Sequence, residues 1–416
     1  MVAALVTTGR RTVANLLRTL RHRAPGHRTD YQRVLSRAPW SGLTLGCALM
    51  RFVLDHLLPA GPVMLVGDDT GDGHTSPCVY GKARHRDAVR SSHSYTAWRY
   101  GHKWVVLAVL IKFPFATRPW ALPVLIDLYR SEEADRKRNR SHRTPARIRC
   151  VLVRVLRIRF PNRTFVFAGD AGSGTHEVTR FCHRHRNRLT LVRKLHPDAN
   201  VFGPPPPYAG KGRPRVKGPR APKPRQAVDA ATALTPLTAG WYGGGQRQVD
   251  TLTGTGHGSK AGRGLVAIRW VFVRDATGTP RDESFFTTDL GLSVSAVIAA
   301  YCGRWNIETT FQELRSELGL ETTRGWREKT VLRAAPCLFG LYTVVAIRFP
   351  TRPESKRTGA VEWPGKTGTT FSDALAAVRR WLWAESLLPQ ASQTRGLEKL
   401  PEPVRELLLT TLAPAA

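Results

Sequence analysis

Acidic residues directly follow two short apolar runs, where a carboxylate can be held at the edge of a rigid sheet. Asp68 and Asp69 come after the run at 63–67, and Asp170 comes after the run at 165–169. Such runs are typical of short buried strands, and the small polar residues that follow them are typical of turns. Carboxylate oxygens in that position suit a hard divalent cation. Each acid taken alone is also consistent with an ordinary turn at the end of a strand.

A third acid lies in a segment with helical periodicity. On a helix at about 100° per residue, Tyr301, Arg304, Glu308 and Arg315 share an arc of about 60°. Beside that arc lies an apolar stripe that would pin the helix to a core, formed by Ile307, Phe311, Leu314 and Leu318. A solvated Arg304–Glu308 pair would explain part of the pattern. Four functional groups beside one buried stripe favour a site.

The elements that must position these residues alternate between strands and helices. Strands are expected at 63–66, 104–111, 121–128, 165–167 and 189–192. Helices are expected after the Thr144-Pro145 pair, a typical N-cap followed by proline at the first helical position, and near 174–186. This order predicts an α/β core with a mixed sheet.

The remaining segments differ from the core in composition and in hydrophobic periodicity. The first 60 residues are basic and helical in pattern, and residues 203–226 combine prolines with lysine and arginine and contain no acid. That composition predicts an extended basic loop. Residues 240–290 are β-rich, helical periodicity returns at about 293–318, and a stretch rich in proline and glycine at 350–369 leads to a helix from Ser372.

The charge balance indicates a polyanionic partner. The chain has 416 residues, with 64 Lys and Arg against 31 Asp and Glu, a net charge of +33. Nucleic acid is the expected partner of such a chain. The excess of arginine over lysine suits bidentate phosphate contacts, although a G+C-rich genome explains that excess equally well.

Other classes of protein are disfavoured. The apolar run Trp104–Ile111 is far shorter than a membrane span, and the N-terminus does not resemble a signal peptide. The six cysteines form no CxxC pair, and the cluster at 182–185 lacks a second ligand pair at zinc-finger spacing. We expect a reduced cytosolic protein without disulfides and without a membrane partner.

The three acidic motifs together resemble those of DDE transposases of bacterial insertion sequences. The similarity is greatest to the branch defined by a Tyr-Arg-Glu-Lys signature, Tyr-x2-Arg-x3-Glu-x6-Lys. The first motif matches Asp68-Asp69-Thr70, the second Gly169–Gly172 and the third Tyr301–Arg315. The similarity also covers 79–87, 101–104 and 371–375. One departure is that Arg315 stands where the signature has lysine, so a planar guanidinium replaces a compact ammonium.

This resemblance implies an α/β fold with a ribonuclease-H-like catalytic core, interrupted by a β-rich insertion and flanked by helical N- and C-terminal regions. The expected parts are a helical basic DNA-binding region at 1–60, the first part of the core at 61–200, the β-rich insertion with its basic loop at 201–290, the second part of the core with the glutamate helix at 291–350, and a C-terminal linker and helices at 351–416.

The resemblance also implies a chemistry. Asp68, Asp170 and Glu308 would be catalytic and would hold two Mg²⁺ or Mn²⁺ ions, for phosphodiester hydrolysis and strand transfer. Asp69 remains the rival first ligand. Further DNA contacts are expected from Tyr301, Arg304, Arg315, Lys82, Arg84, Arg213, Arg215 and Lys217. Trp241 and Trp270, in the insertion, could stack on an unpaired base, but core packing is favoured for both.

The implied partners are the terminal inverted repeats of a transposon and a target DNA. Cutting two ends in concert favours a homodimer during the reaction. The expected location is the cytoplasm of a bacterium, in association with the nucleoid. Two alternatives remain at this stage. One is an inactive or repurposed DNA-binding protein derived from a transposase, and the other is a different nuclease with a ribonuclease-H-like core.

Overall fold

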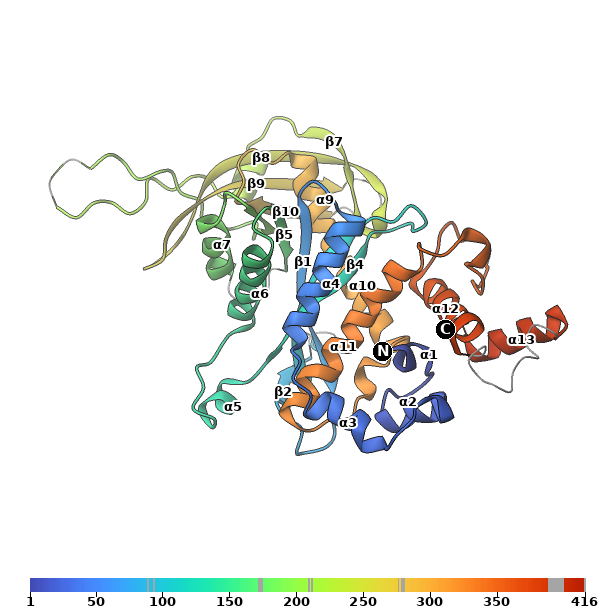
Figure 1. Ribbon diagram of the computed structural model, residues 1–416. Coiled ribbons are helices and arrows are strands. Elements are labelled where there is room, and N and C mark those ends of the chain that lie inside the picture. Colours follow the sequence, from blue (N-terminus) through green and yellow to red (C-terminus); the bar gives the residue numbers. More distant parts are fainter. Residues whose placement is uncertain are drawn as a thin grey trace.

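A single ten-stranded sheet forms the centre of the molecule (Figure 1). The computed structural model describes residues 1–87, 90–92, 94–170, 175–208, 210, 212–275, 277, 281–387 and 400–414. The strands are β1 Val63–Gly73, β2 Ala83–Arg86, β3 Trp98–Ile111, β4 Trp120–Tyr129, β5 Phe165–Gly169, β6 Leu189–Lys194, β7 Thr235–Gly240, β8 Gln246–Lys260, β9 Gly264–Asp275 and β10 Arg281–Thr287.

Helices surround this sheet. The α-helices are α1 Val2–Val6, α2 Val13–Leu20, α3 Arg28–Ser36, α4 Gly42–Leu57, α5 Glu132–Arg136, α6 Pro145–Arg159, α7 Thr175–Arg184, α8 Pro224–Asp229, α9 Val294–Arg304, α10 Asn306–Ser316, α11 Glu328–Arg348, α12 Phe371–Trp381 and α13 Glu402–Leu412. Short helical turns are η1 Arg21–Arg23, η2 Tyr242–Gly244, η3 Leu320–Thr322, η4 Glu354–Lys356 and η5 Leu382–Leu387. The predicted cap of α6 is confirmed, because the Thr144 hydroxyl accepts a hydrogen bond from the Arg147 amide at 3.2 Å.

The strand order gives the core a ribonuclease-H-like topology. β1, β5 and β6 are parallel neighbours, β3 lies antiparallel to β1, and β4 lies antiparallel to β3. The expected fold class, an α/β ribonuclease-H-like core, is therefore confirmed. The prediction that a strand at 63–66 ends in a turn is wrong at its C-terminal end, because β1 continues to Gly73, paired with β3 as far as Gly101.

The β-rich insertion continues the core sheet. β10 pairs antiparallel with β6, and β9, β8 and β7 follow in order. A separate apolar cluster lies between these strands and α9; it includes Val192, Val271, Phe285 and Tyr301. The insertion is therefore joined to the core by backbone hydrogen bonds between β10 and β6, and α9 packs on the strands of both parts.

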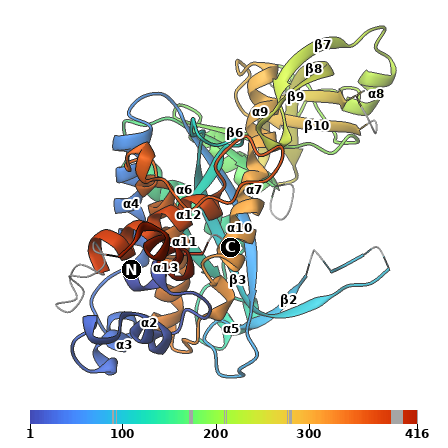
Figure 2. The same cartoon turned by 90° about the vertical axis from the view of Figure 1, so that its right-hand side faces the viewer.

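Two groups of helices cover the sheet of the core. α6 contacts β3 and β4 and packs on α7. From the other face, α9 contacts β1, β5 and β6, and α10 contacts β1 and β4 (Figure 2). α4 and α11 pack on β4 and on each other. α4, which the sequence assigned to a basic N-terminal region, is therefore part of the core.

α11 is a long apolar helix that the sequence analysis did not predict. Its length and composition would allow it to cross a membrane, with a mean hydropathy of 1.7 over 18 residues. However, 61% of that window is buried inside the protein, where it packs on β4 and α4. Core packing accounts for its apolar character.

The contact of α4 with β4 requires a glycine. A β-carbon on Gly46 would lie 2.2 Å from the backbone carbonyl oxygen of Val124, which cannot move aside without disturbing the sheet. We expect Gly46→Ala to lower the free energy of unfolding by about 1–3 kcal/mol or more, as for other overpacked cores.

Chemical denaturation measures this change. Gly258→Ala is the matched control. A β-carbon on Gly258 would lie 4.0 Å from the carbonyl oxygen of Val266, which is an ordinary contact distance. Equal midpoints for Gly46→Ala and the wild type would contradict the close packing of α4 on β4.

Candidate active site

Asp68 and Asp69 point to opposite faces of the sheet. Since successive side chains of a strand alternate, the two neighbours on β1 meet different helices. The Asp68 carboxylate accepts a hydrogen bond from Arg304 Nη1 of α9 at 2.9 Å. Asp69 pairs with Arg149 Nη2 of α6 at 2.9 Å and with Lys103 Nζ at 3.2 Å. Asp68 therefore shares a face with Arg304, and Asp69 belongs to a separate ion-pair network behind the sheet.

Asp170 is placed beside Asp68 by strand register. β1 and β5 are parallel, with Gly67 opposite Gly169, so the residues that follow both glycines are neighbours. Asp170 comes directly after β5, as the sequence predicted. The other residues of its motif, Ala171 and Gly172, lie outside the described residues.

Glu308 completes the acidic group from the other half of the chain. Its carboxylate accepts a hydrogen bond from Arg304 Nη1 at 3.1 Å, so one guanidinium nitrogen joins Asp68 and Glu308. The helix predicted over 301–315 is interrupted at Trp305, between α9 and α10. The Trp305 amide bonds to Cys302 and the Glu308 amide to Trp305, which tightens the chain locally and still leaves Arg304 facing Glu308.

Burial controls the electrostatics of this group. Burial raises the pKa of Asp68 to about 6, even though Arg304 and the Asp69 amide lower it, and Asp170 adds a small increase. Arg304 is itself 4% exposed, and its pKa lies above the ordinary value because Asp68, Tyr301 and Glu308 outweigh the effect of burial. Asp68 and Arg304 are thus strongly coupled.

The donor atoms of this group are of the kind that a divalent cation binds. Asp68, Asp170 and Glu308 offer only carboxylate oxygens, the ligands that Mg²⁺ and Mn²⁺ prefer. The side chain of Asp68 is 17% exposed and that of Glu308 35%, so an ion can approach from the Glu308 side. The raised pKa of Asp68 indicates that Arg304 alone does not neutralise this carboxylate fully.

Tyr301 and Arg315 occupy positions inside the protein. Tyr301 is buried against Phe285, with ring centroids 4.5 Å apart, and burial raises the pKa of its phenol. Arg315 donates hydrogen bonds to the Thr70 hydroxyl and, at 3.3 Å, to the Gly71 carbonyl. It also pairs with Glu321 at 3.3 Å. Arg315 therefore ties α10 to β1, two residues beyond Asp68.

The other cations expected to contact DNA lie on projecting segments. Lys82 donates to the carbonyls of Thr75 and Ser76, next to an arm formed by β2 and the start of β3 (Figure 2). Arg84, on that arm, lies 4.2 Å from the ring centre of the exposed Trp98. Exposed cations also lie on the long green loop that projects from the sheet in Figure 1, namely Arg213, Arg215 and Lys217.

The two tryptophans of the insertion are packed to different extents. Trp270 is 7% exposed, in β9, and its ring fills the space above Gly254. Trp241 is half-buried and meets Tyr242 edge to face. The ring of Trp270 is therefore part of the core.

The sequence analysis did not identify two buried arginines next to the site, Arg193 and Arg149. Arg193 of β6 is fully buried and donates a hydrogen bond to the Asp170 carbonyl oxygen, while burial and the nearby Arg149 lower its pKa to about 10. Arg149, in α6, is buried against Asp69. The only sequence signal for either residue is an arginine within an apolar strand or on the buried stripe of a helix.

Comparison with known proteins shows the family of the chain. The family model of the DDE superfamily endonucleases matches residues 1–248, which include Asp68 and Asp170. The chain belongs to this family, whose members are endonucleases that generally use divalent metal ions. No curated protein matches the chain significantly. A similar solved structure is the cryo-EM structure of a piggyBac transposase synaptic complex with hairpin DNA, at 10% identity and a TM-score of 0.41 over 99% of this chain and 74% of that one.

The raised pKa of Asp68 predicts how stability depends on pH. The pKa of about 6 in the folded chain exceeds the ordinary 3.8, so the proton-linked stability is complete below about pH 4 and is lost as the pH rises through 6. Asp68→Asn removes this loss. In metal-free buffer at pH 8 we expect the variant to be more stable by up to about 3 kcal/mol, with a melting temperature a few degrees higher.

Thermal unfolding between pH 4 and pH 8 tests this expectation. The gain should shrink through pH 6 and vanish near pH 4. Asp69→Asn is the control, and it should be destabilised at pH 8 because Arg149 loses a charged partner. A gain for Asp68→Asn that is equal at pH 4 and pH 8 would contradict the assignment.

Proposed function

We propose that this endonuclease is a transposase, which cuts the ends of a DNA element and joins them to a target. The observation that carries the proposal is the meeting of Asp68, Asp170 and Glu308 around Arg304 on a ribonuclease-H-like sheet. The spacing of Tyr301, Arg304, Glu308 and Arg315 supports placing the chain in the Tyr-Arg-Glu-Lys branch of bacterial insertion sequences, with arginine in place of the lysine.

The three carboxylates would hold the metal. Asp68 is favoured over Asp69 as the first ligand, because Asp69 is engaged by Arg149 and Lys103 on the opposite face. Two Mg²⁺ or Mn²⁺ ions, when bound, would supply activation of the attacking oxygen and stabilisation of the leaving oxygen in phosphodiester displacement.

The remaining residues of the site position these acids. Arg304 holds Asp68 against Glu308, Arg193 supports the backbone of Asp170, and Arg315 fixes Thr70 relative to α10. Such support matters because phosphoryl transfer depends mainly on the placement of charged groups. We assign Arg304 and Arg315 first to this positioning, and to phosphate contact only where DNA reaches the site.

DNA is the proposed partner, as terminal inverted repeats and as target. The arm presents exposed cations beside exposed aromatic rings, with Arg84 over Trp98 and Tyr100 57% exposed. Cations track phosphates and aromatic rings stack on bases, so this combination suits DNA near a cut end. Processing of two ends in one reaction favours a homodimer in the working complex.

We expect Asp170→Asn and Glu308→Gln each to reduce Mg²⁺-dependent cleavage of a repeat-bearing plasmid to background and to leave binding of the repeat DNA nearly unchanged. The reason is that each change removes an anionic oxygen ligand while keeping the shape of the side chain. Asp69→Asn is the matched control, and it should retain cleavage at 25 °C.

The same plasmid assay separates the proposal from its alternatives. Excision or strand transfer that requires the terminal repeats supports a transposase. Nicking that ignores the repeats indicates a different nuclease, and binding without any cleavage indicates a repurposed DNA-binding protein. Cleavage by Glu308→Gln at the wild-type rate would overturn the assignment of the third acid.

Binding of repeat DNA should weaken steeply with salt, because each neutralised phosphate releases counterions. We expect Arg84→Ala to reduce the slope of log K against log salt by about 1, and the triple change of Arg213, Arg215 and Lys217 to alanine to reduce it by about 3. Arg136→Ala is the control, because Arg136 is exposed but already paired with Glu132 in α5. A flat plot for the wild type would contradict phosphate contact.

A further inference from the structure

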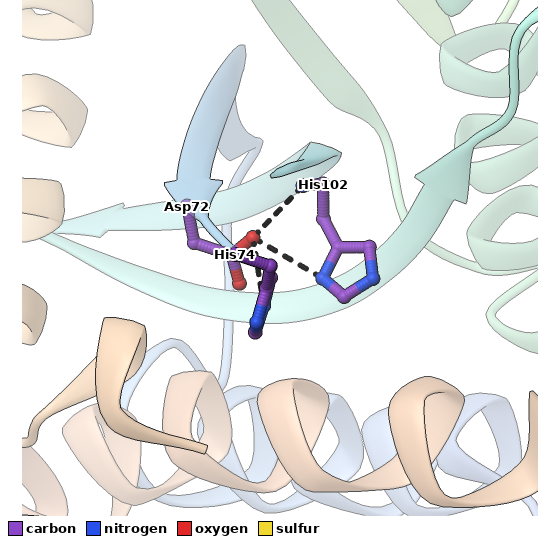
Figure 3. Close-up of side chains that lie close together, drawn as sticks. All are labelled: Asp72, His74 and His102. Carbon is purple, nitrogen blue, oxygen red and sulfur yellow. Dashed lines mark hydrogen bonds and ion pairs between the residues drawn. The ribbon is translucent and has the colours of Figure 1, made fainter. Parts of the chain in front are cut away.

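A second cluster of possible metal ligands lies on β1, four residues beyond Asp68. Asp72 of β1, His74 just after it and His102 of β3 each direct a ligand atom to one point, and these atoms lie within 4.8 Å of one another (Figure 3). Asp72 is 1% exposed and His102 3%. The cluster does not include the three acids of the active site.

The hydrogen bonds of His102 fix which of its nitrogens is free to bind an ion. Its Nε2 lies 2.9 Å from the Tyr80 carbonyl oxygen, which can only accept, so Nε2 carries the proton. In the neutral ring Nδ1 then presents a lone pair toward Asp72 Oδ1, 3.2 Å away. Two buried acceptors that face each other require a positive charge between them.

The distances favour a metal ion over a proton. His102 Nδ1 and His74 Nε2 lie 3.2 Å and 3.4 Å from the same oxygen, Asp72 Oδ1, and within the described part of the chain this long contact is the polar contact of each buried nitrogen. Charge-assisted N–H···O bonds are shorter, at about 2.7–2.9 Å. Ligand atoms at the usual distances around a tetrahedral zinc ion are separated by about 3.3 Å.

The groups behind the ligands are those of a supported metal site. His102 donates its other ring proton to a backbone carbonyl, which orients the ring, and the second oxygen of Asp72 accepts a hydrogen bond from Trp104 Nε1 at 3.1 Å. His74 borders a cavity of about 390 Å³ that Cys78 and Trp326 also line, from which water can reach the fourth position.

We propose that Asp72, His74 and His102 bind one zinc-class transition-metal ion with a structural role. Two imidazoles and one carboxylate suit Zn²⁺ and not the hard Mg²⁺ expected at the acids. The ion joins the end of β1 to β3 and to the segment that leads into the arm. Tyr80, which anchors His102, also bonds to Trp326 and Glu328 at the start of α11. The site does not depend on the proposed transposase activity.

The test uses the full-length protein, stripped with a chelator and titrated with Co²⁺ alone, with Zn²⁺ as competitor. We expect one equivalent of Co²⁺ with the visible absorption of a tetrahedral site, displaced by Zn²⁺ and not by Mg²⁺. His74→Asn and His102→Gln should weaken binding by about 100-fold or more, at least the effect of losing a supporting group around a metal. Two controls should bind as the wild type does: His56→Asn, which changes an exposed histidine of α4 outside the cluster, and Glu308→Gln.

Thermal unfolding with and without Zn²⁺ keeps the test decisive if His102→Gln folds poorly. Zn²⁺ should raise the melting temperature of the wild type and of Glu308→Gln, and it should leave that of His74→Asn unchanged. Absence of tight Zn²⁺ or Co²⁺ binding by the wild type would overturn the proposal. Binding that survives in His74→Asn, or that is lost in Glu308→Gln, would overturn it as well.

Discussion

The Arg304 guanidinium is the interaction on which the site depends. One of its nitrogens bonds to Asp68 and Glu308, residues that lie 240 positions apart and belong to a central strand and a covering helix. A buried cation that holds two carboxylates offsets part of the repulsion that would separate them. The contact therefore determines how α10 lies on β1 and how close the acids stand before any divalent ion is bound.

The same strand serves three separate tasks, because Asp68 and Asp69 point to opposite faces and Asp72 lies four residues further along the strand. Asp68 faces α9, Asp69 faces α6, and Asp72, further along, faces the two histidines. Arg149 and Arg193 are buried cations beside these acids. Arg149 pairs with the Asp69 carboxylate, and Arg193 donates a hydrogen bond to the Asp170 carbonyl oxygen. β1 thus carries three carboxylates, in a chain whose net charge is +33.

Local pattern was sufficient to predict part of this structure. Helical periodicity placed Ile307, Phe311, Leu314 and Leu318 on a buried stripe, and all four are buried. The capped start of α6 and the strand that ends before Asp170 also followed from residue types. These features depend on neighbours in sequence, which a single chain displays directly.

What the sequence could not give depends on distant partners. The segment after Val66 reads as a turn because it is rich in glycine and aspartate, yet it continues as a strand. One reason is that Gly101, on β3, leaves room for a close approach, since a β-carbon there would lie 1.7 Å from the Asp72 carbonyl oxygen. The pairing of Asp72 with His102, and of Asp170 with Arg193, follows only from strand register.

The pairing of β10 with β6 has a mechanical consequence. Because the inserted strands are hydrogen-bonded to the sheet that carries the acids, and α9 packs on both, the insertion cannot swing freely on a flexible tether. It behaves as a stiff lever. A load applied to its far strands, for instance by a bound macromolecule, would reach α9 and the guanidinium at its end through continuous backbone and packed side chains.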